Sequence, residues 1–149
     1  LLDFLTPFEF WQYVGSLYGR TAEEVEAFLP FFQGFLDANV AQRKAPYIRD
    51  LSLGNQKKVG IVAALIAAPR LLVLDEPFAN LDPGSQLRLR HLLQQQSRDL
   101  GNTLLVSSHD LHHVTEVCSR IVVIEDGAVV RDVPTSEASL HELETYFAA

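Results

Sequence analysis

The sequence contains no methionine and a single cysteine, Cys118. One cysteine cannot form an internal disulfide and fits a reducing compartment, so we expect Cys118 to be a small packing residue. Long apolar runs are missing as well, because the run at residues 61–68 is cut by Pro69 and Arg70. A membrane-spanning helix needs about 18 or more consecutive apolar residues. We therefore predict that the chain does not itself cross a bilayer.

Basic residues are also scarce. Lys and Arg number 12 against 19 Asp and Glu, which gives a formal net charge of −7 and a pI of about 5.1. A broad nucleic-acid footprint needs clustered Lys and Arg that displace counterions, so we expect no nucleic-acid partner. This balance still allows a local anion site. The chain opens on Leu1-Leu2-Asp3 without a signal-peptide pattern, and we interpret it as a segment of a longer protein.

The sequence is organised around residues 71–77, in which four apolar residues run into Asp75, Glu76 and Pro77. A short apolar run bounded by prolines predicts a strand that is buried on both faces of a parallel sheet. The two carboxylates then lie at the carboxyl end of the strand, where open α/β sheets hold ligands. One acid can hold a divalent metal there, and the other can polarise a water for attack. The alternative is a strand that ends in a solvated acidic turn.

A second candidate site precedes an apolar helix that we expect at about residues 55–67. The N-terminus of such a helix presents free N–H groups and the positive end of the helix dipole, which suits an anion. Ser52 adds a hydroxyl donor, and Gly54 has no side chain to block a phosphate. The alternative is that Ser52 only caps the helix. Asp82, followed by Pro83, is typical of the N-cap of a further helix.

His109 follows a second apolar strand, residues 103–107, which we also expect to be buried. It should therefore lie at the same sheet edge as the two carboxylates, where an imidazole can reach a phosphate. A structural hydrogen bond is the alternative role for this histidine. We interpret His112 and His113 as surface residues of the next helix.

The first third of the chain is predicted to be helical, because capping boxes at Thr6 and Thr21 open two helices and Pro30 breaks the second. Most of its aromatic residues should lie in the core, and an exposed remainder could dock a partner helix. Asp126-Gly127 predicts a type I′ hairpin turn. The remaining expected elements are a helix at residues 83–100, strands at residues 121–125 and 128–131, and a terminal helix from a capping box at Ser139 to about residue 147.

Four segments together carry a resemblance to a known family. They are LSLGNQKK at residues 51–58, LLVLDEP at residues 71–77, NLD at residues 80–82 and SSHD at residues 107–110. In this order and spacing they resemble the signature motif, Walker B motif, D-loop and switch histidine of ATP-binding-cassette (ABC) ATPases, and most of all the ATPase subunits of bacterial exporter-type transporters. The first segment departs from the common L-S-G-G-Q at Leu53 and Asn55, although asparagine can still donate a hydrogen bond. The resemblance covers essentially the whole chain.

The resemblance implies an α/β fold that comprises part of a RecA-like P-loop NTPase core, with a parallel sheet and flanking helices, and a small α-helical subdomain. We expect the helical subdomain, with the signature motif and its helix, at residues 1–68. The C-terminal half of the nucleotide-binding core should then occupy residues 69–149.

The same resemblance implies ATP and Mg²⁺ as cofactors. Asp75 would hold Mg²⁺ largely through water, Glu76 would act as general base, and His109 would stabilise the transferred phosphate. The residues implied to bind nucleotide held by the opposite subunit, or to lie at that dimer interface, are Ser52, Gly54, Asn55 and Asp82. On this interpretation the cap at Asp82 is structural and lies at the interface as well.

The implied partners are a transmembrane permease and a second nucleotide-binding subunit, as in a homodimer. The protein would be cytoplasmic and peripheral on the inner face of the cell membrane, where ATP hydrolysis powers transport. A rival is a DNA- or ribosome-acting ATPase of the same superfamily, but the sequence shows neither a long coiled coil nor a basic linker. A further alternative is a non-catalytic fragment.

No glycine-rich loop of the form G-x-x-x-x-G-K-[ST] occurs in the sequence. In the resembled family the strand before that loop lies between the strands at residues 103–107 and 121–125. We therefore expect residues 1–149 alone to be inactive and not to form a stable monomer with an open gap in the sheet. Residues outside this sequence should supply the strand; the alternatives are rearranged edges or pairing with another copy.

Overall fold

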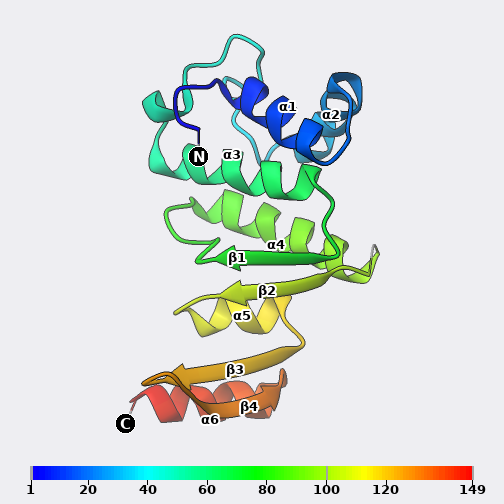
Figure 1. Cartoon of the computed structure of the whole chain (residues 1–149). Coiled ribbons are helices and arrows are strands. Elements are labelled where there is room, and N and C mark those ends of the chain that lie inside the picture. The colour runs from blue at the N-terminus through cyan, green and yellow to red at the C-terminus, as the bar shows by residue number, and fades with distance from the viewer. Residues whose placement is uncertain (1, 100, 149) are drawn as a thin grey trace.

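The computed structural model describes residues 2–99 and 101–148. A helical N-terminal part is followed by alternating strands and helices (Figure 1). The elements are α1 (Pro7–Leu17), α2 (Ala22–Phe28), the 3₁₀ helices η1 (Leu29–Phe32) and η2 (Ile48–Asp50), α3 (Leu53–Ile66), β1 (Leu71–Asp75), α4 (Pro83–Arg98), β2 (Thr103–Ser107), α5 (Leu111–Val117), β3 (Arg120–Glu125), β4 (Ala128–Pro134) and α6 (Glu137–Ala148). None of the described helices combines the length and apolar character that crossing a bilayer requires.

Helices α1 and α2 begin where the sequence predicts, because a reciprocal capping box caps the N-terminus of each helix. The Thr6 backbone N–H donates to the Glu9 carboxylate at 2.8 Å, and the Thr6 hydroxyl accepts from the Glu9 N–H at 3.3 Å. Thr21 and Glu24 repeat this pair at 2.8 and 3.2 Å. After α2 the chain tightens into η1, which contains Pro30, as expected for a residue without an N–H donor.

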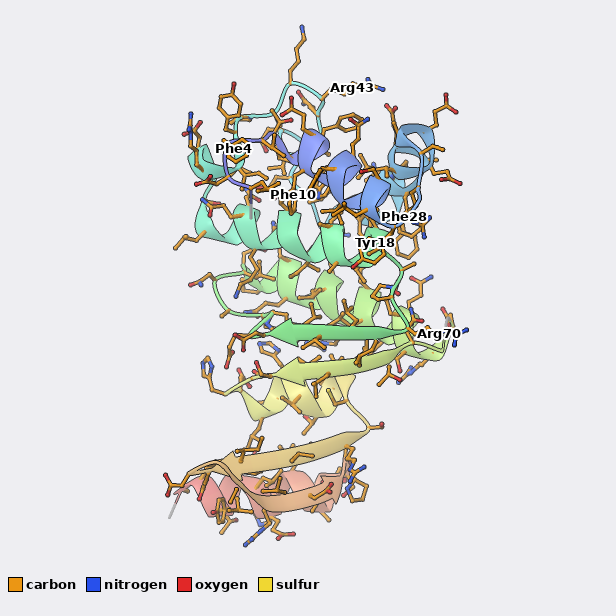
Figure 2. All side chains as sticks on the ribbon, viewed as in Figure 1. Phe4, Phe10, Tyr18, Phe28, Arg43 and Arg70 are labelled. Atoms are coloured by element: carbon orange, nitrogen blue, oxygen red, sulfur yellow. The ribbon has the colours of Figure 1, made fainter. Side chains whose placement is uncertain are left out.

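Trp11 of α1 joins the helical part to α3. Its side chain is fully buried, and its indole Nε1 donates to the Val59 carbonyl at 3.0 Å. Figure 2 shows Phe10 between α1 and α3, whereas the side chains of Phe4 and Tyr18 are exposed. The aromatic residues of the first third therefore divide between core and surface. The buried ones are Phe8, Phe10, Trp11, Phe32 and Phe35, and the exposed ones are Phe4, Tyr13, Tyr18 and Phe31.

The strands form two separate pairs. β1 and β2 are parallel, whereas β3 and β4 are antiparallel. Figure 1 shows β3 running in the same direction as β1 and β2, and among the described residues no strand pairs with the facing edges of β2 and β3. The parallel sheet is thus interrupted where the sequence predicts a missing strand. Within residues 2–99 and 101–148, no rearranged strand closes these edges.

The prediction that the strands are buried on both faces is wrong for the described chain. Leu72 and Leu74 are buried with residues of α3 and α4, whereas Leu71 and Val73 are 54% and 60% exposed. β2 alternates between exposed and half-buried residues, and Leu105 is 59% exposed. The cause is that the helices pack on one face, and no described element covers the other.

The core does not break at the domain boundary predicted between residues 68 and 69. One cluster of buried residues extends from α1 through α3 to β1 and α4. A smaller cluster, formed by Ile121, Val123 and Leu143, joins β3 to α6. The division into residues 1–68 and 69–149 stays a prediction.

The C-terminal hairpin is confirmed, but the start of the last helix is not where the sequence predicts it. Asp126 and Gly127 have φ of 48° and 77°, and a type I′ turn requires positive φ at both positions. α6 begins at Glu137 instead of near Ser139. The Ser136 hydroxyl accepts from the Ser139 N–H at 3.1 Å, so Ser136 is the cap and Ser139 lies within the first turn.

Lys58 of α3 is a buried cation whose side chain is 6% exposed. Its Nζ lies 2.9 Å from Asp37 Oδ1 and 3.7 Å from Asp82 Oδ2. These carboxylates belong to the loop after η1 and to the cap of α4, so one ammonium group joins three parts of the chain. Hydrogen bonds from Lys58 and then from Asn55 lower the pKa of Asp37 below its ordinary value of 3.8.

We predict that Asp37→Asn lowers the free energy of unfolding by about 2 kcal/mol, because a buried ammonium loses its nearest charged partner. The loss stays below that for a fully buried pair, since the Asp37 side chain is 48% exposed and Asp82 remains near. Because the pKa of Asp37 is lowered in the folded state, its ionisation stabilises that state fully above about pH 3.8, and this stabilisation is lost progressively as the pH falls from there through the lowered pKa.

Equilibrium unfolding of the full-length protein in urea, between about pH 7 and about pH 3, measures both effects. Asp50→Asn is the matched control, because the Asp50 side chain is 58% exposed and its ion pair with Arg49 is long, at 4.0 Å. An equal loss in both variants, or a difference that does not shrink in acid, would contradict the prediction.

Candidate active site

The carboxyl ends of β1 and β2 meet at one edge of the sheet, and Ser107 orients both predicted acids there. The parallel register places Asp75 beside Ser107. The Ser107 hydroxyl donates to Asp75 Oδ1 at 2.5 Å and accepts from the Glu76 N–H at 3.1 Å. The Ser107 carbonyl accepts from the same N–H at 3.2 Å. Sequence reasoning missed this role, although Ser107 lies just before His109.

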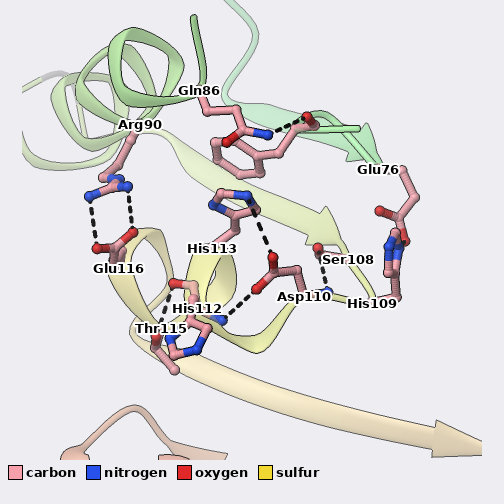
Figure 3. Close-up of polar contacts among 11 residues, drawn as sticks. Glu76, Gln86, Arg90, Ser108, His109, Asp110, His112, His113, Thr115 and Glu116 are labelled. Carbon is pink, nitrogen blue, oxygen red and sulfur yellow. Dashed lines mark hydrogen bonds and ion pairs between the residues drawn. The ribbon is translucent and has the colours of Figure 1, made fainter. Parts of the chain in front are cut away.

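His109 lies against Glu76 at this edge. Its Nδ1 is 2.9 Å from Glu76 Oε1 (Figure 3), although the two residues are 33 positions apart in the chain. Both side chains are accessible, 81% exposed for His109 and 35% for Glu76. The hydrogen bond to Glu76, and then the charge of that carboxylate, raise the pKa of His109 above 6.5. The structure thus brings together the predicted base and the predicted histidine, a pair that can hold or move a proton.

The backbone of Glu76 adopts an uncommon conformation. Its φ is +45°, in the left-handed region that residues other than glycine rarely occupy. Two neighbours hold it there: Ser107 accepts its N–H, and its carbonyl accepts from Lys57 Nζ at 2.6 Å. Such strained positions persist only where the surroundings fix them, and they concentrate at functional sites. No pattern in the sequence indicates the contact with Lys57.

The oxygen atoms at the sheet edge suit Mg²⁺. Asp75 is exposed at the end of β1 and offers a carboxylate that Ser107 orients. Hard oxygen ligands are those Mg²⁺ prefers, and it commonly keeps several waters beside one or two carboxylates. Within residues 2–99 and 101–148, no group of three or more His, Cys, Asp and Glu side chains is arranged to hold a metal. A single oriented carboxylate is compatible with the water-rich coordination that Mg²⁺ prefers.

Ser52 and Gly54 lie at the start of α3. Ser52 is the N-cap, and its hydroxyl oxygen accepts from the Asn55 N–H at 3.3 Å. The helix accordingly begins at Leu53, slightly before the predicted residue 55. A Cβ atom on Gly54 would lie 2.6 Å from the Asn80 carbonyl oxygen, so the packing of α3 against the loop after β1 requires a glycine here.

Asn55 and Asp82 also have structural partners. Asn55 Nδ2 donates to Asp37 Oδ2 at 3.0 Å, so this carboxamide is engaged within the chain. Asp82 caps α4, and hydrogen bonds from the hydroxyl and N–H of Ser85 lower the pKa of Asp82 to about 2. With Ser52 and Gly54, these residues form a group around the start of α3. Asp75, Glu76 and His109 form the group at the sheet edge.

The prediction that His113 is a surface residue is wrong. Its side chain is 16% exposed, and its ring stacks on Phe78 with centroids 4.4 Å apart. His113 Nε2 lies 3.7 Å from Asp110 Oδ2 (Figure 3). His112 is exposed, as predicted. His113 thus packs α5 against the loop that carries Glu76.

Known proteins resemble this chain in sequence. A family model described as "AAA domain, putative AbiEii toxin, Type IV TA system" matches residues 34–114. A putative ABC transporter ATP-binding protein of Gloeobacter violaceus is 43% identical over 88 residues, which cover 59% of this chain and 34% of that protein. The methionine import ATP-binding protein of Carboxydothermus hydrogenoformans is 35% identical over 95 residues, which cover 64% of this chain and 28% of that protein.

Solved structures share the fold. The structure of an ATP-binding subunit of an ABC transporter matches with a TM-score of 0.84 and 28% identity, covering 100% of this chain and 65% of that chain. A dimeric structure of a bacterial ABC transporter cassette matches with a TM-score of 0.77 and 25% identity, covering 91% of this chain and 59% of that chain. These neighbours confirm the predicted fold class, part of a RecA-like core with flanking helices.

The family model covers more than half of the chain, from the loop after η1 to α5. The chain spans only 28% and 34% of the length of the two curated relatives, so they share a part of their structure with it. The chain therefore belongs to the AAA-domain family that this model describes, and its relatives and structural neighbours include ATP-binding proteins of ABC transporters.

Proposed function

We propose that the full-length protein hydrolyses ATP as a subunit of an ABC transporter and powers transport through a separate membrane permease. The contact of 2.9 Å between Glu76 and His109, beside Asp75 at the carboxyl edge of a parallel sheet, carries this proposal. The names of the relatives support it, since they are ATP-binding proteins of transporters.

Glu76 and His109 divide the chemistry of hydrolysis. Glu76 has a carboxylate open to solvent and accepts the proton of the attacking water as general base. His109 has a raised pKa, so it carries positive charge over a wider pH range and stabilises the phosphate that is transferred. Asp75, oriented by Ser107, holds Mg²⁺. When bound, this ion neutralises charge on the phosphates.

Ser52 can act both as a cap and as a phosphate donor. As the cap it uses a lone pair to accept from the Asn55 N–H, which leaves its hydroxyl proton free to donate. We propose that Ser52, with Gly54, Asn55 and Asp82 beside it, completes the ATP site of a second copy of the subunit. A dimeric neighbour structure of the same family supports this assembly.

The location and the type of transporter follow from the same proposal. Docked on a permease, the subunit lies on the inner face of the membrane. The exporter type stays a prediction, because the relatives include methionine and thiamine import ATP-binding proteins. Copurification with a membrane protein favours this function over the rival DNA- or ribosome-acting ATPase, whereas copurification with nucleic acid or ribosomes would reverse that choice.

We predict that Glu76→Gln in the full-length protein lowers ATP turnover by about 100-fold or more and leaves ATP binding intact, because the amide is nearly isosteric but cannot accept the proton. Turnover is measured by phosphate release and binding by calorimetry. Glu23→Gln, an exposed change on α2, is the matched control and should leave both unchanged. Normal turnover by Glu76→Gln would show that another group is the base.

We also predict that residues 1–149 alone neither bind nor hydrolyse ATP with useful affinity. The sequence contains no G-x-x-x-x-G-K-[ST] loop, whose N–H groups and lysine provide most of the phosphate contacts in P-loop ATPases. Calorimetry with Mg-ATP tests this, with the full-length protein as positive control. Low-micromolar or tighter binding by the isolated chain would refute it.

The pKa of His109 should fall toward 6.5 in the Glu76→Gln variant, because the carboxylate that raises it is removed. The charge interaction between the imidazolium and Glu76 is fully present below about pH 6.5 and is lost as the pH rises through the raised pKa. NMR titration of the histidine signals in the full-length protein measures this change. An identical titration of His109 in wild type and variant would show that Glu76 does not contact it in solution.

A further inference from the structure

Lys57 connects the start of α3 to the proposed catalytic base. Its Nζ donates to the Glu76 carbonyl oxygen at 2.6 Å, a hydrogen bond that spans 19 positions of the chain. A bond from an ammonium group is stronger than one between neutral groups. The contact is partly buried, which limits competition from water. Lys57 therefore holds the backbone of Glu76 rather than its carboxylate.

The hydrogen bond from Lys57 holds the carbonyl side of Glu76, whose N–H side is held by Ser107. Ser107 of β2 holds the N–H of Glu76 through two acceptors, at 3.1 and 3.2 Å. The carbonyl, on the other side of the left-handed Cα, is held by Lys57. With both flanking peptide groups fixed, the Cα–Cβ bond of Glu76 points in one direction. From this position the Glu76 side chain reaches His109, with Oε1 2.9 Å from Nδ1.

The start of α3 meets the Glu76 loop at two further points. Gly54 packs against the Asn80 carbonyl, and Lys58 lies 3.7 Å from the Asp82 carboxylate. These contacts seat the helix on the loop, whereas Lys57 reaches the residue whose side chain does the proposed chemistry. A hydrogen bond thus connects α3 directly to Glu76.

Resting on the proposed ATPase function, we propose that Lys57 is a positioning residue for Glu76. It holds the Glu76 carbonyl so that the carboxylate keeps its place beside His109. Because Ser52 caps the same helix, Lys57 also couples the serine that faces the second subunit to the base of its own subunit. Occupation of one ATP site of the dimer can in this way adjust the base of the other.

The test uses the full-length protein and compares Lys57→Met with Lys57→Arg. Methionine keeps an unbranched apolar chain of nearly the same length but cannot donate, so kcat should fall about 10-fold or more while KM for ATP changes less than about two-fold. Arginine can still donate to the carbonyl and should restore most of the rate. Lys44→Met, an exposed change in the loop before η2, is the matched control and should behave as wild type.

A double-mutant cycle separates positioning from general stability. If Lys57 acts through the Glu76 carboxylate, Lys57→Met should not lower further the residual single-turnover rate of Glu76→Gln. An equal fold-loss in both backgrounds would show that Lys57 acts independently of Glu76 and would overturn the proposal. A wild-type kcat in Lys57→Met, or a Lys57→Arg variant as impaired as Lys57→Met, would overturn it as well.

The outcome is distinguishable from a failure of the proposed function. Absent hydrolysis in wild type, or normal hydrolysis in Glu76→Gln, would overturn the function or the role of Glu76. Full loss in Glu76→Gln together with an unaffected Lys57→Met would overturn the role of Lys57 alone. Thermal unfolding of the single and double variants establishes that each rate belongs to folded protein.

Discussion

The seating of α3 on the loop after β1 is the constraint on which the rest of the structure depends. The N-terminal end of α3 can approach this loop only because Gly54 has no Cβ atom that would clash with the Asn80 carbonyl oxygen. It is held there by Lys58, a buried charge paired with carboxylates from two other segments. The same contact surface unites the helical part of the chain with the sheet in one core. Packing and electrostatics thus fix the relation between the two groups of candidate site residues.

Two adjacent lysines, Lys57 and Lys58, hold α3 against different segments of the chain. They can do so because consecutive helical residues point about 100° apart. Lys57 reaches the Glu76 carbonyl, and Lys58 reaches Asp37 and Asp82. One side chain therefore acts on the strained residue at the sheet edge, and its neighbour holds the surrounding segments together. Neither role follows from the positive charge alone, since it depends on which face of α3 each residue occupies.

Local signals were predictable from the sequence, whereas contacts between distant segments were not. The capping boxes at Thr6 and Thr21 and the turn at Asp126 are determined within a few residues, and the structure confirms them. The start of α6 was misplaced because Ser136 and Ser139, three positions apart, can both serve as caps. Burial on both faces of the strands was expected because a strand's composition does not reveal which elements cover it.

In the candidate site, too, the residues named by local motifs were predictable and the long-range contacts that support them were not. Motif order was sufficient to name Asp75, Glu76 and His109, which the structure places at one sheet edge. The supporting role of Ser107 and the stacking of His113 on Phe78 are long-range contacts that no local pattern encodes.

The left-handed backbone of Glu76 costs local stability, and it occurs at the residue that we propose as the general base. Glycine adopts this conformation without strain, so the chain would gain backbone stability there by giving up the carboxylate. Stabilising changes selected at this position would therefore remove the proposed general base. Improvements sought by consensus or thermal screening belong elsewhere in the molecule, where function does not depend on a strained conformation.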